Sequence, residues 1–256
     1  MILAAGLGTR LRPLTDHRPK ALVEIAGRTL LEICLSRLRV FGVREAIVNV
    51  HHFAGMVVDY LQANQNFGMT VEISREERLL DTGGGLKKAS WFFLEPGAAA
   101  PSAAANEPFI LHNVDVLSTI DLAHMIRFHS ERNALATLAV QDRPTSRPLL
   151  FNRQGLFQGR AAQRDRAREP ASYAPAPGSE PLAFSGIHIV SPRIFAKLHE
   201  QGAFSIIDAY VRLAAEGEKI LAFPADDSYW RDLGRPENIL AATRDIESGT
   251  YSENKT

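Results

Sequence analysis

The chain has 256 residues, 45% of them hydrophobic, which is enough for a packed core and one large domain. Its 29 Lys and Arg residues balance 29 Asp and Glu residues, and this zero net charge argues against a nucleic-acid partner. No apolar run approaches the ~20 residues that span a bilayer, so no membrane partner is expected. The only cysteine, Cys34, excludes a disulfide within the chain and favours a cytoplasmic location.

The first half of the chain alternates predicted strands with predicted helices. The strands are expected at Ile2–Ala5, Ala46–Val50, Thr70–Ser74 and Phe109–His112, and the helices at Thr29–Val40, Ala54–Gln62, Gly85–Phe93 and Leu122–Arg132. Such alternation predicts an α/β fold: a Rossmann-like, mostly parallel sheet flanked by helices. Because ligands bind at the carboxyl ends of parallel strands, Gly6 and Asp115 are expected at one edge of the sheet.

The second half is richer in strands. Strands are expected at Leu135–Val140, Pro148–Asn152, Leu156–Gln158, Phe184–Val190 and Ile220–Phe223, with a short strand ending at Trp230. Helices are expected at Pro192–His199, Ile206–Glu216 and Pro236–Glu247. We therefore expect a single domain over residues 1–256, in which residues 135–256 form a β-rich extension of residues 1–134. Residues 97–106 and 160–181 have the composition of loops.

The first loop has the features of a phosphate site. Gly6 and Gly8 let the backbone approach an anion, Arg10 offers a planar fork of donors, and Lys20 adds a compact charge. A dinucleotide fingerprint would need Gly or Ala where Leu11 stands, and no Walker A sequence occurs in the chain. The loop therefore predicts a polyphosphate site of another kind.

Several motifs resemble the sugar-1-phosphate nucleotidyltransferases. They are Leu3-Ala4-Ala5-Gly6-Leu7-Gly8-Thr9-Arg10, Pro13-Leu14-Thr15, Pro19-Lys20, Asp81-Thr82-Gly83-Gly84-Gly85, Asn113-Val114-Asp115 and Trp230-Arg231-Asp232-Leu233-Gly234. Within that family, the triple glycine and Phe184-Ser185-Gly186-Ile187 most resemble the N-acetylmuramate-1-phosphate uridylyltransferases. The resemblance implies that residues 1–134 bind the nucleotide and residues 135–256 hold the sugar.

The resemblance also implies a reaction and its participants. A sugar-1-phosphate oxygen attacks the α-phosphorus of a nucleoside triphosphate, and Mg²⁺ is held by Asp115 and Asp232 together with phosphates and waters. Arg10 is expected to face the β- and γ-phosphates, and Lys20 the α-phosphate and the sugar phosphate. Arg10, Lys20 and Asp115 are thus the implied catalytic residues.

The remaining implied contacts divide between the two substrates. The nucleotide-binding residues are Ala4, Gly6, Gly8, Thr9, Arg10, Thr82 and Gly83. The sugar-phosphate-binding residues are Lys20, Asn113, Ser185 and Gly186. One departure is the absence of the Glu-Lys-Pro motif that many relatives use for the sugar, and Arg147, Arg160 or Arg164 could replace its lysine.

Three functions remain open at this point. The leading hypothesis is transfer from UTP to an N-acetylated hexosamine phosphate such as N-acetylmuramate-1-phosphate, as part of cell-wall precursor synthesis. A guanylyltransferase acting on mannose- or heptose-1-phosphate is the alternative within enzymes. A non-catalytic, nucleotide-sugar-binding regulatory subunit is the alternative of another class, and the oligomeric state stays open in all three.

Overall fold

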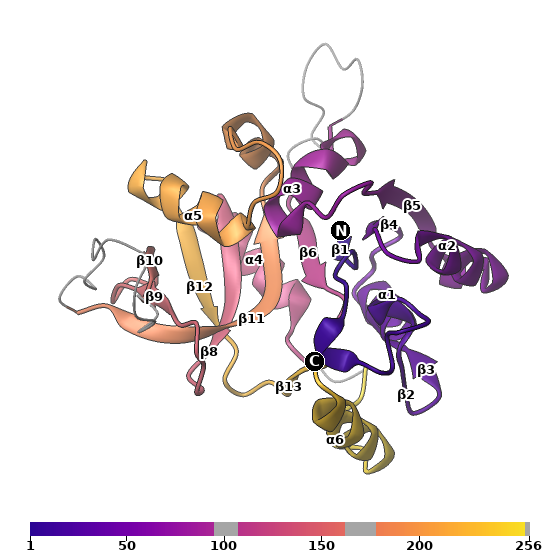
Figure 1. The fold of residues 1–256 in the computed structure, drawn as a ribbon. Coiled ribbons are helices and arrows are strands. Elements are labelled where there is room, and N and C mark those ends of the chain that lie inside the picture. Colours follow the sequence, from indigo (N-terminus) through magenta and orange to yellow (C-terminus); the bar gives the residue numbers. More distant parts are fainter. Residues whose placement is uncertain (95–106, 162–177, 254–256) are drawn as a thin grey trace, which may run out of the picture.

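The protein is built on a mixed nine-stranded sheet, seen in a computed structural model that describes residues 1–94, 107–161 and 178–253 (Figure 1). The strand order is β10-β9-β11-β6-β1-β4-β5. In addition, β8 pairs with β11, and β12 pairs with β8. The strands of this sheet are β1 (Ile2–Leu3), β4 (Glu45–Val50), β5 (Thr70–Arg75), β6 (Phe109–Asn113), β8 (Ala136–Gln141), β9 (Leu149–Phe151), β10 (Phe157–Arg160), β11 (Glu180–Val190) and β12 (Ile220–Pro224).

Two short strand pairs lie outside the large sheet. They are β2 (Glu24–Ile25) with β3 (Arg28–Thr29), and β7 (Val116–Ser118) with β13 (Trp230–Asp232). The α-helices are α1 (Leu30–Val40), α2 (Ala54–Ala63), α3 (Asp81–Lys88), α4 (Leu122–Glu131), α5 (Ile206–Ala215) and α6 (Pro236–Glu247). The 3₁₀ helices are η1 (Thr9–Leu11), η2 (Lys20–Leu22), η3 (Gln65–Gly68), η4 (Ala89–Phe92) and η6 (Pro192–Lys197). None of the helices in these described ranges is long and apolar enough to cross a membrane.

The expected α/β fold is confirmed, with a sheet that is parallel in one part and mixed in the other. Strands β6, β1, β4 and β5 run parallel, as the alternation of strands and helices predicts. Strand β11 then runs antiparallel to β6, β8 and β9, while β12 is parallel to β8. The long strand β11 therefore joins the two halves of the chain into one sheet.

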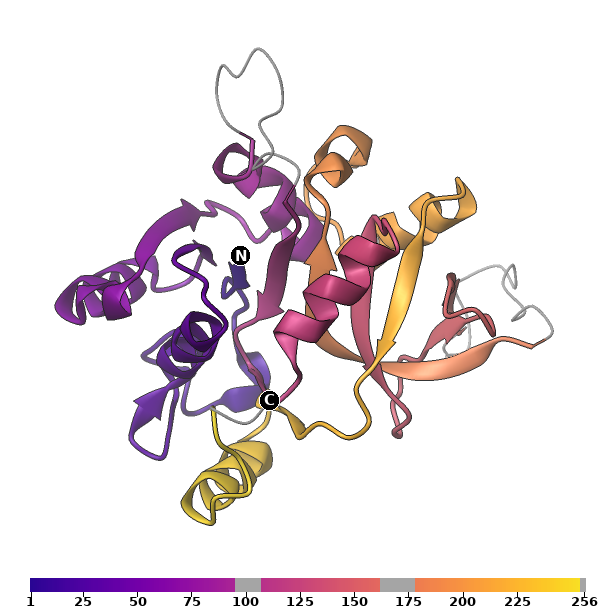
Figure 2. The same cartoon turned by 180° about the vertical axis from the view of Figure 1, so that it is seen from behind.

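The core has two apolar layers, one on each face of the sheet. Neighbouring strand residues alternate between them, as the pleat of a strand requires: Val48 and Ile110 belong to one layer, and Ile47 and Leu111 to the other. The first layer includes residues of α1 and α4, and the second includes residues of α3 and α5. Figures 1 and 2 show α4 and α5 on opposite faces of the sheet.

Side-chain caps fix where three of the helices begin. Thr29 accepts a hydrogen bond from the Glu32 backbone N–H at α1, in the spacing of a capping box. Asp121 accepts from His124 N–H at α4, and Ser205 accepts from Ile207 N–H at α5. Each cap satisfies an N–H that has no partner within its own helix, which is why these helices start close to their predicted positions.

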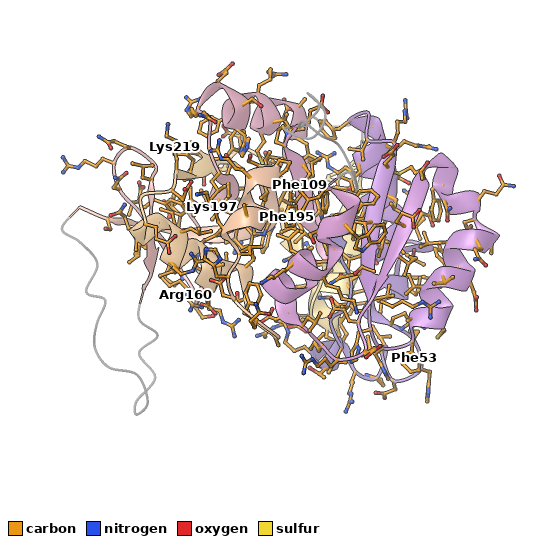
Figure 3. The ribbon with its side chains drawn as sticks, turned by 90° about the horizontal axis from the view of Figure 1, so that it is seen from above. Phe53, Phe109, Arg160, Phe195, Lys197 and Lys219 are labelled. Carbon is orange, nitrogen blue, oxygen red and sulfur yellow. The ribbon has the colours of Figure 1, made fainter. Side chains whose placement is uncertain are left out.

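Three predicted elements of the second half differ from the structure. The short strand expected to end at Trp230 instead begins there, as β13. The segment predicted as a helix from Pro192 to His199 is the 3₁₀ helix η6, whose Phe195 stacks on Phe109 of β6 with 5.7 Å between ring centroids (Figure 3). Strand β11 begins at Glu180 rather than at Phe184, because its first residues pair with β9.

Candidate active site

The first loop and the Asn113–Asp115 segment leave the sheet at the same edge, as predicted. Leu3 of β1 is paired with Asn113 of the parallel strand β6, and Val114 N–H donates to the Leu3 carbonyl over 3.1 Å. The chain after β1 and the chain after β6 are therefore neighbours from the moment they leave the sheet. This adjacency positions the glycine loop beside Asp115.

The glycine loop folds back on the residues that follow it. Gly8 has φ 66°, a left-handed conformation that favours glycine, and its carbonyl accepts a hydrogen bond from Thr15 Oγ1 over 2.8 Å. A Cβ atom at Gly8 would lie 2.9 Å from Thr15 Cγ2 and 3.1 Å from Lys20 Cβ. Gly6 and Thr9 are exposed, so the open side of the loop faces outward.

The two aspartates of the predicted metal site come together although they lie far apart in the sequence. Strand β13 pairs with β7 so that Asp232 lies opposite Val116, the residue after Asp115. Leu233 N–H donates to the Asp115 carbonyl over 2.8 Å, which joins the two segments directly beside both carboxylates. The Asp232 side chain accepts a hydrogen bond from Gly234 N–H over 2.7 Å.

Both predicted cations reach this pair of carboxylates. Lys20 Nζ forms an ion pair with Asp115 Oδ2, and both side chains are largely buried. Arg10 lies against Gly234, where a Cβ would be 2.5 Å from Arg10 Nη2 and 2.7 Å from Asp232 Oδ1. The structure therefore collects two positive and two negative side chains at one edge of the sheet.

The donor set at this edge suits Mg²⁺. Mg²⁺ is usually held by one or two carboxylates, with substrate phosphates and waters completing its octahedral shell. Asp115 and Asp232 supply two carboxylates, and the part of the chain that the structure describes has no group of three or more His, Cys, Asp or Glu side chains placed to hold a metal. A site of this kind depends on substrate phosphates for its remaining ligands.

The triple glycine lies inside a helix rather than before one, which corrects the predicted start at Gly85. Helix α3 begins at Asp81, and the N–H groups of Gly83 and Gly84 both donate to the Phe204 carbonyl. Thr82 Oγ1 accepts from Ile206 N–H over 2.9 Å. The glycines allow α3 to pack closely on the start of α5, and nucleotide binding by Thr82 and Gly83 stays a prediction.

A buried pair that was not predicted from the sequence, Asn49 and Glu76, joins the two predicted nucleotide-binding segments. Asn49 Oδ1 accepts from Ala4 N–H over 2.7 Å, and Asn49 Nδ2 donates to Glu76 Oε1 over 2.7 Å. Glu76 Oε2 in turn accepts from Leu80 N–H over 2.9 Å, just before α3. A polar Asn49 at the end of an apolar strand was the available signal.

The residues predicted to bind the sugar lie in an irregular part of β11. The pairing of β11 with β8 shifts between Phe184 and His188, and Gly186 in that interval has φ 76°. A Cβ at Gly186 would lie 3.0 Å from Asn113 Nδ2, so these two predicted residues are neighbours. Ser185 is fully buried, and its carbonyl accepts from Trp230 Nε1 over 2.8 Å. Their contact with a sugar stays a prediction.

The three arginines considered as replacements for the missing lysine differ in position. Arg160, at the end of β10, forms an ion pair with Asp208 of α5 (Figure 3). Arg147 is exposed. Arg164 lies outside the described residues, as does most of the predicted loop 160–181.

The fold and the collected charges are those of a nucleotidyltransferase. Residues 1–152 match the family model described as nucleotidyl transferase, and the chain belongs to this family. It is 34% identical over 251 residues to the N-acetylmuramate alpha-1-phosphate uridylyltransferase of Caulobacter vibrioides, covering 94% of both chains. It is 27% identical over 247 residues to the mannose-1-phosphate guanyltransferase of Yarrowia lipolytica, covering 95% of this chain and 62% of that protein.

Solved structures agree on the fold. The chain superposes on HddC from Yersinia pseudotuberculosis complexed with GMP-PN with a TM-score of 0.72, at 22% identity, covering 96% of this chain and 97% of that one. The resemblance to the sugar-1-phosphate nucleotidyltransferases is thereby confirmed, and the protein is an enzyme of this family.

Proposed function

We propose that this protein is a Mg²⁺-dependent uridylyltransferase that joins UTP to a sugar-1-phosphate, giving a nucleoside diphosphate sugar and pyrophosphate. One observation supports this above all: the pairing of β13 with β7 brings Asp232 beside Asp115, whose carboxylate is already paired with Lys20. Two carboxylates and a lysine at one point suit a reaction whose charge develops on phosphate oxygens.

The proposed step is an in-line displacement at the α-phosphorus of UTP. An oxygen of the sugar phosphate forms a bond to that phosphorus, the bond from it to the bridging oxygen of the β-phosphate breaks, and pyrophosphate leaves with the electron pair. Lys20 neutralises charge on the α-phosphate and on the incoming phosphate, and Arg10 holds the β- and γ-phosphates. Mg²⁺ bound by Asp115 and Asp232 would supply further charge neutralisation. Positioning of this kind accounts for most of the catalysis in phosphoryl-type transfer.

For the substrates, we propose UTP and an N-acetylated hexosamine phosphate, with N-acetylmuramate-1-phosphate as the leading acceptor. The support is the 34% identity to the Caulobacter vibrioides uridylyltransferase over nearly the whole of both chains. An acceptor of this kind would place the enzyme in cytoplasmic synthesis of a cell-wall precursor. The second candidate, guanylyl transfer to mannose-1-phosphate, is favoured by the 27% identity to the Yarrowia lipolytica enzyme.

A matrix of substrates tests this proposal. Purified protein with Mg²⁺ is assayed for pyrophosphate release with UTP or GTP against N-acetylmuramate-1-phosphate, N-acetylglucosamine-1-phosphate and mannose-1-phosphate. We expect kcat/KM to favour UTP over GTP by at least ~10-fold with the best acceptor, the scale on which a pocket that excludes bulk discriminates. A preference for GTP with mannose-1-phosphate would establish the second candidate. Absence of release with every pair would refute the proposed function.

A further inference from the structure

Arg143, just after β8, is a cation that the structure holds firmly without an acidic partner. Its guanidinium carbon lies 3.5 Å from the centroid of the Trp230 ring, a stacked cation–π arrangement. Nη2 donates to the Phe184 carbonyl over 2.9 Å, and Nε donates to Gln141 Oε1 over 3.2 Å. Contacts from β8, β11 and β13 therefore fix the plane and position of this side chain.

The contacts of Arg143 leave its charge unmatched and part of its donor fork free. Among the described residues, no carboxylate forms an ion pair with Arg143, and Nη1 donates to none of them. Burial lowers the pKa of Arg143, while the opposite charge of Asp232 acts to raise it. A half-buried, planar guanidinium that lacks an acidic partner is well suited to bind an oxyanion such as a phosphate or a carboxylate.

The location of Arg143 associates it with the sugar acceptor rather than with the nucleotide. Its ring partner, Trp230, is two residues before Asp232 and donates to the Ser185 carbonyl over 2.8 Å. Its backbone partner, Phe184, directly precedes the irregular Ser185–Gly186 segment. Arg143 thus lies between the predicted sugar contacts and one of the two carboxylates, in the second half of the chain.

We propose that Arg143 binds an oxyanion of the acceptor, with Trp230 and Phe184 as positioning residues. This inference rests on the proposed transfer to a sugar-1-phosphate. The oxyanion has two possible sources: the 1-phosphate that every acceptor carries, or a carboxylate on the sugar itself, as in a muramic acid derivative. Either anion would accept hydrogen bonds from the Nη1 group of Arg143.

Substitution of Arg143 separates binding of the acceptor from binding of the nucleotide. In Arg143→Ala, KM for the acceptor is expected to rise by roughly 10- to 100-fold, the range for losing a hydrogen bond to a charged group. KM for UTP is expected to stay within about twofold, because the predicted nucleotide-binding residues lie in the first half of the chain. Arg143→Lys keeps the charge but loses the planar fork, so a smaller rise is expected. The matched control is Arg153→Ala, an exposed arginine in the β9–β10 turn, which should leave both constants unchanged.

Two acceptors identify the source of the oxyanion. If KM rises with both N-acetylglucosamine-1-phosphate and N-acetylmuramate-1-phosphate, Arg143 binds the phosphate. If KM rises only with N-acetylmuramate-1-phosphate, Arg143 binds the carboxylate. Either result supports the proposal. An unchanged acceptor KM overturns it, and so does an equal rise of both KM values with a lower melting temperature, because that pattern marks a purely structural role.

Direct binding keeps this inference separate from the proposed function. If the wild type releases no pyrophosphate with any substrate pair, the proposed function fails. Calorimetric titration of each of the two sugar phosphates into wild type and Arg143→Ala then still measures the role of Arg143. At least ~10-fold weaker binding of one or both acceptors to Arg143→Ala is expected. Equal affinity of both proteins for both acceptors would overturn the inference.

Discussion

Replacement of Gly83 by alanine is expected to destabilise the protein through overpacking of α3 against the start of α5. A Cβ atom at Gly83 would lie 2.3 Å from Phe204 Cε2, 2.5 Å from Phe204 Cδ2 and 3.0 Å from the Ile206 backbone nitrogen. The first distance is about 1 Å shorter than the ~3.5 Å at which two carbon atoms attract each other. The Phe204 ring can rotate away, but the backbone nitrogen is held in its hydrogen bond to Thr82.

Gly55 provides a matched control for this substitution. Gly55 is the second residue of α2, Gly83 is the third residue of α3, and no atom lies within 4 Å of a Cβ built at Gly55. Both alanine variants gain helix propensity, up to about 1 kcal/mol. The difference between them is therefore the overpacking cost, about 1–3 kcal/mol.

Urea unfolding followed by circular dichroism measures this difference. Gly55→Ala is expected to be as stable as the wild type or slightly more stable, and Gly83→Ala to be less stable than Gly55→Ala by about 1–3 kcal/mol. The corresponding melting temperatures should differ by about 2–4 °C for each kcal/mol. If both variants unfold at the same urea concentration, close packing does not explain the triple glycine, and the reasoning is refuted.

The other predictions concern the catalytic edge and the buried polar groups. Asp115→Asn and Asp232→Asn are each expected to lower kcat by at least ~10²-fold in the pyrophosphate assay, and wild-type turnover in either would remove that residue from the site. Asn49→Ala leaves a backbone N–H and a buried carboxylate without their partner, so urea unfolding should show a loss of at least ~2 kcal/mol, and a loss below ~0.5 kcal/mol would contradict this. Burial lowers the pKa of His112 to about 4 and that of His188 to about 3 from 6.5, so the unfolded chain binds more protons below pH 6.5. Their contribution to stability should be complete above about pH 6.5 and fall by roughly 4 kcal/mol in total by pH 5, whereas a free energy of unfolding that is flat over this range would exclude neutral buried histidines.

The edge of the sheet could be predicted from the sequence because its signals are local. Apolar strands separated by amphipathic helices imply parallel neighbours, and parallel neighbours end at one edge. Gly6, Gly8, Arg10 and Lys20 stand close together in the sequence, so their chemistry could be recognised as one phosphate site. Their proximity to Asp115 followed from the topology alone.

Other parts of the site depend on contacts between distant segments. Asp232 could be assigned only through the family resemblance, because its neighbour Asp115 is reached through the pairing of two three-residue strands. The Asn49–Glu76 pair and the stacking of Arg143 on Trp230 are side-chain contacts without any periodic pattern. The predicted start of α3 at Gly85 was also wrong, because glycine is a poor helix former. Tertiary packing overrides that preference here, and the helix begins at Asp81.

The fate of the UTP phosphorus atoms tests the proposed transfer most directly. UTP labelled at the α-phosphorus, and in a parallel reaction at the γ-phosphorus, is incubated with the protein, Mg²⁺ and the best acceptor. Nucleotidyl transfer to the sugar phosphate predicts that the α label appears in a nucleoside diphosphate sugar and the γ label in pyrophosphate, in equal amounts, and that a chelator stops both. Recovery of the γ label as inorganic phosphate or on the sugar, with the α label remaining in UDP, would contradict transfer at the α-phosphorus.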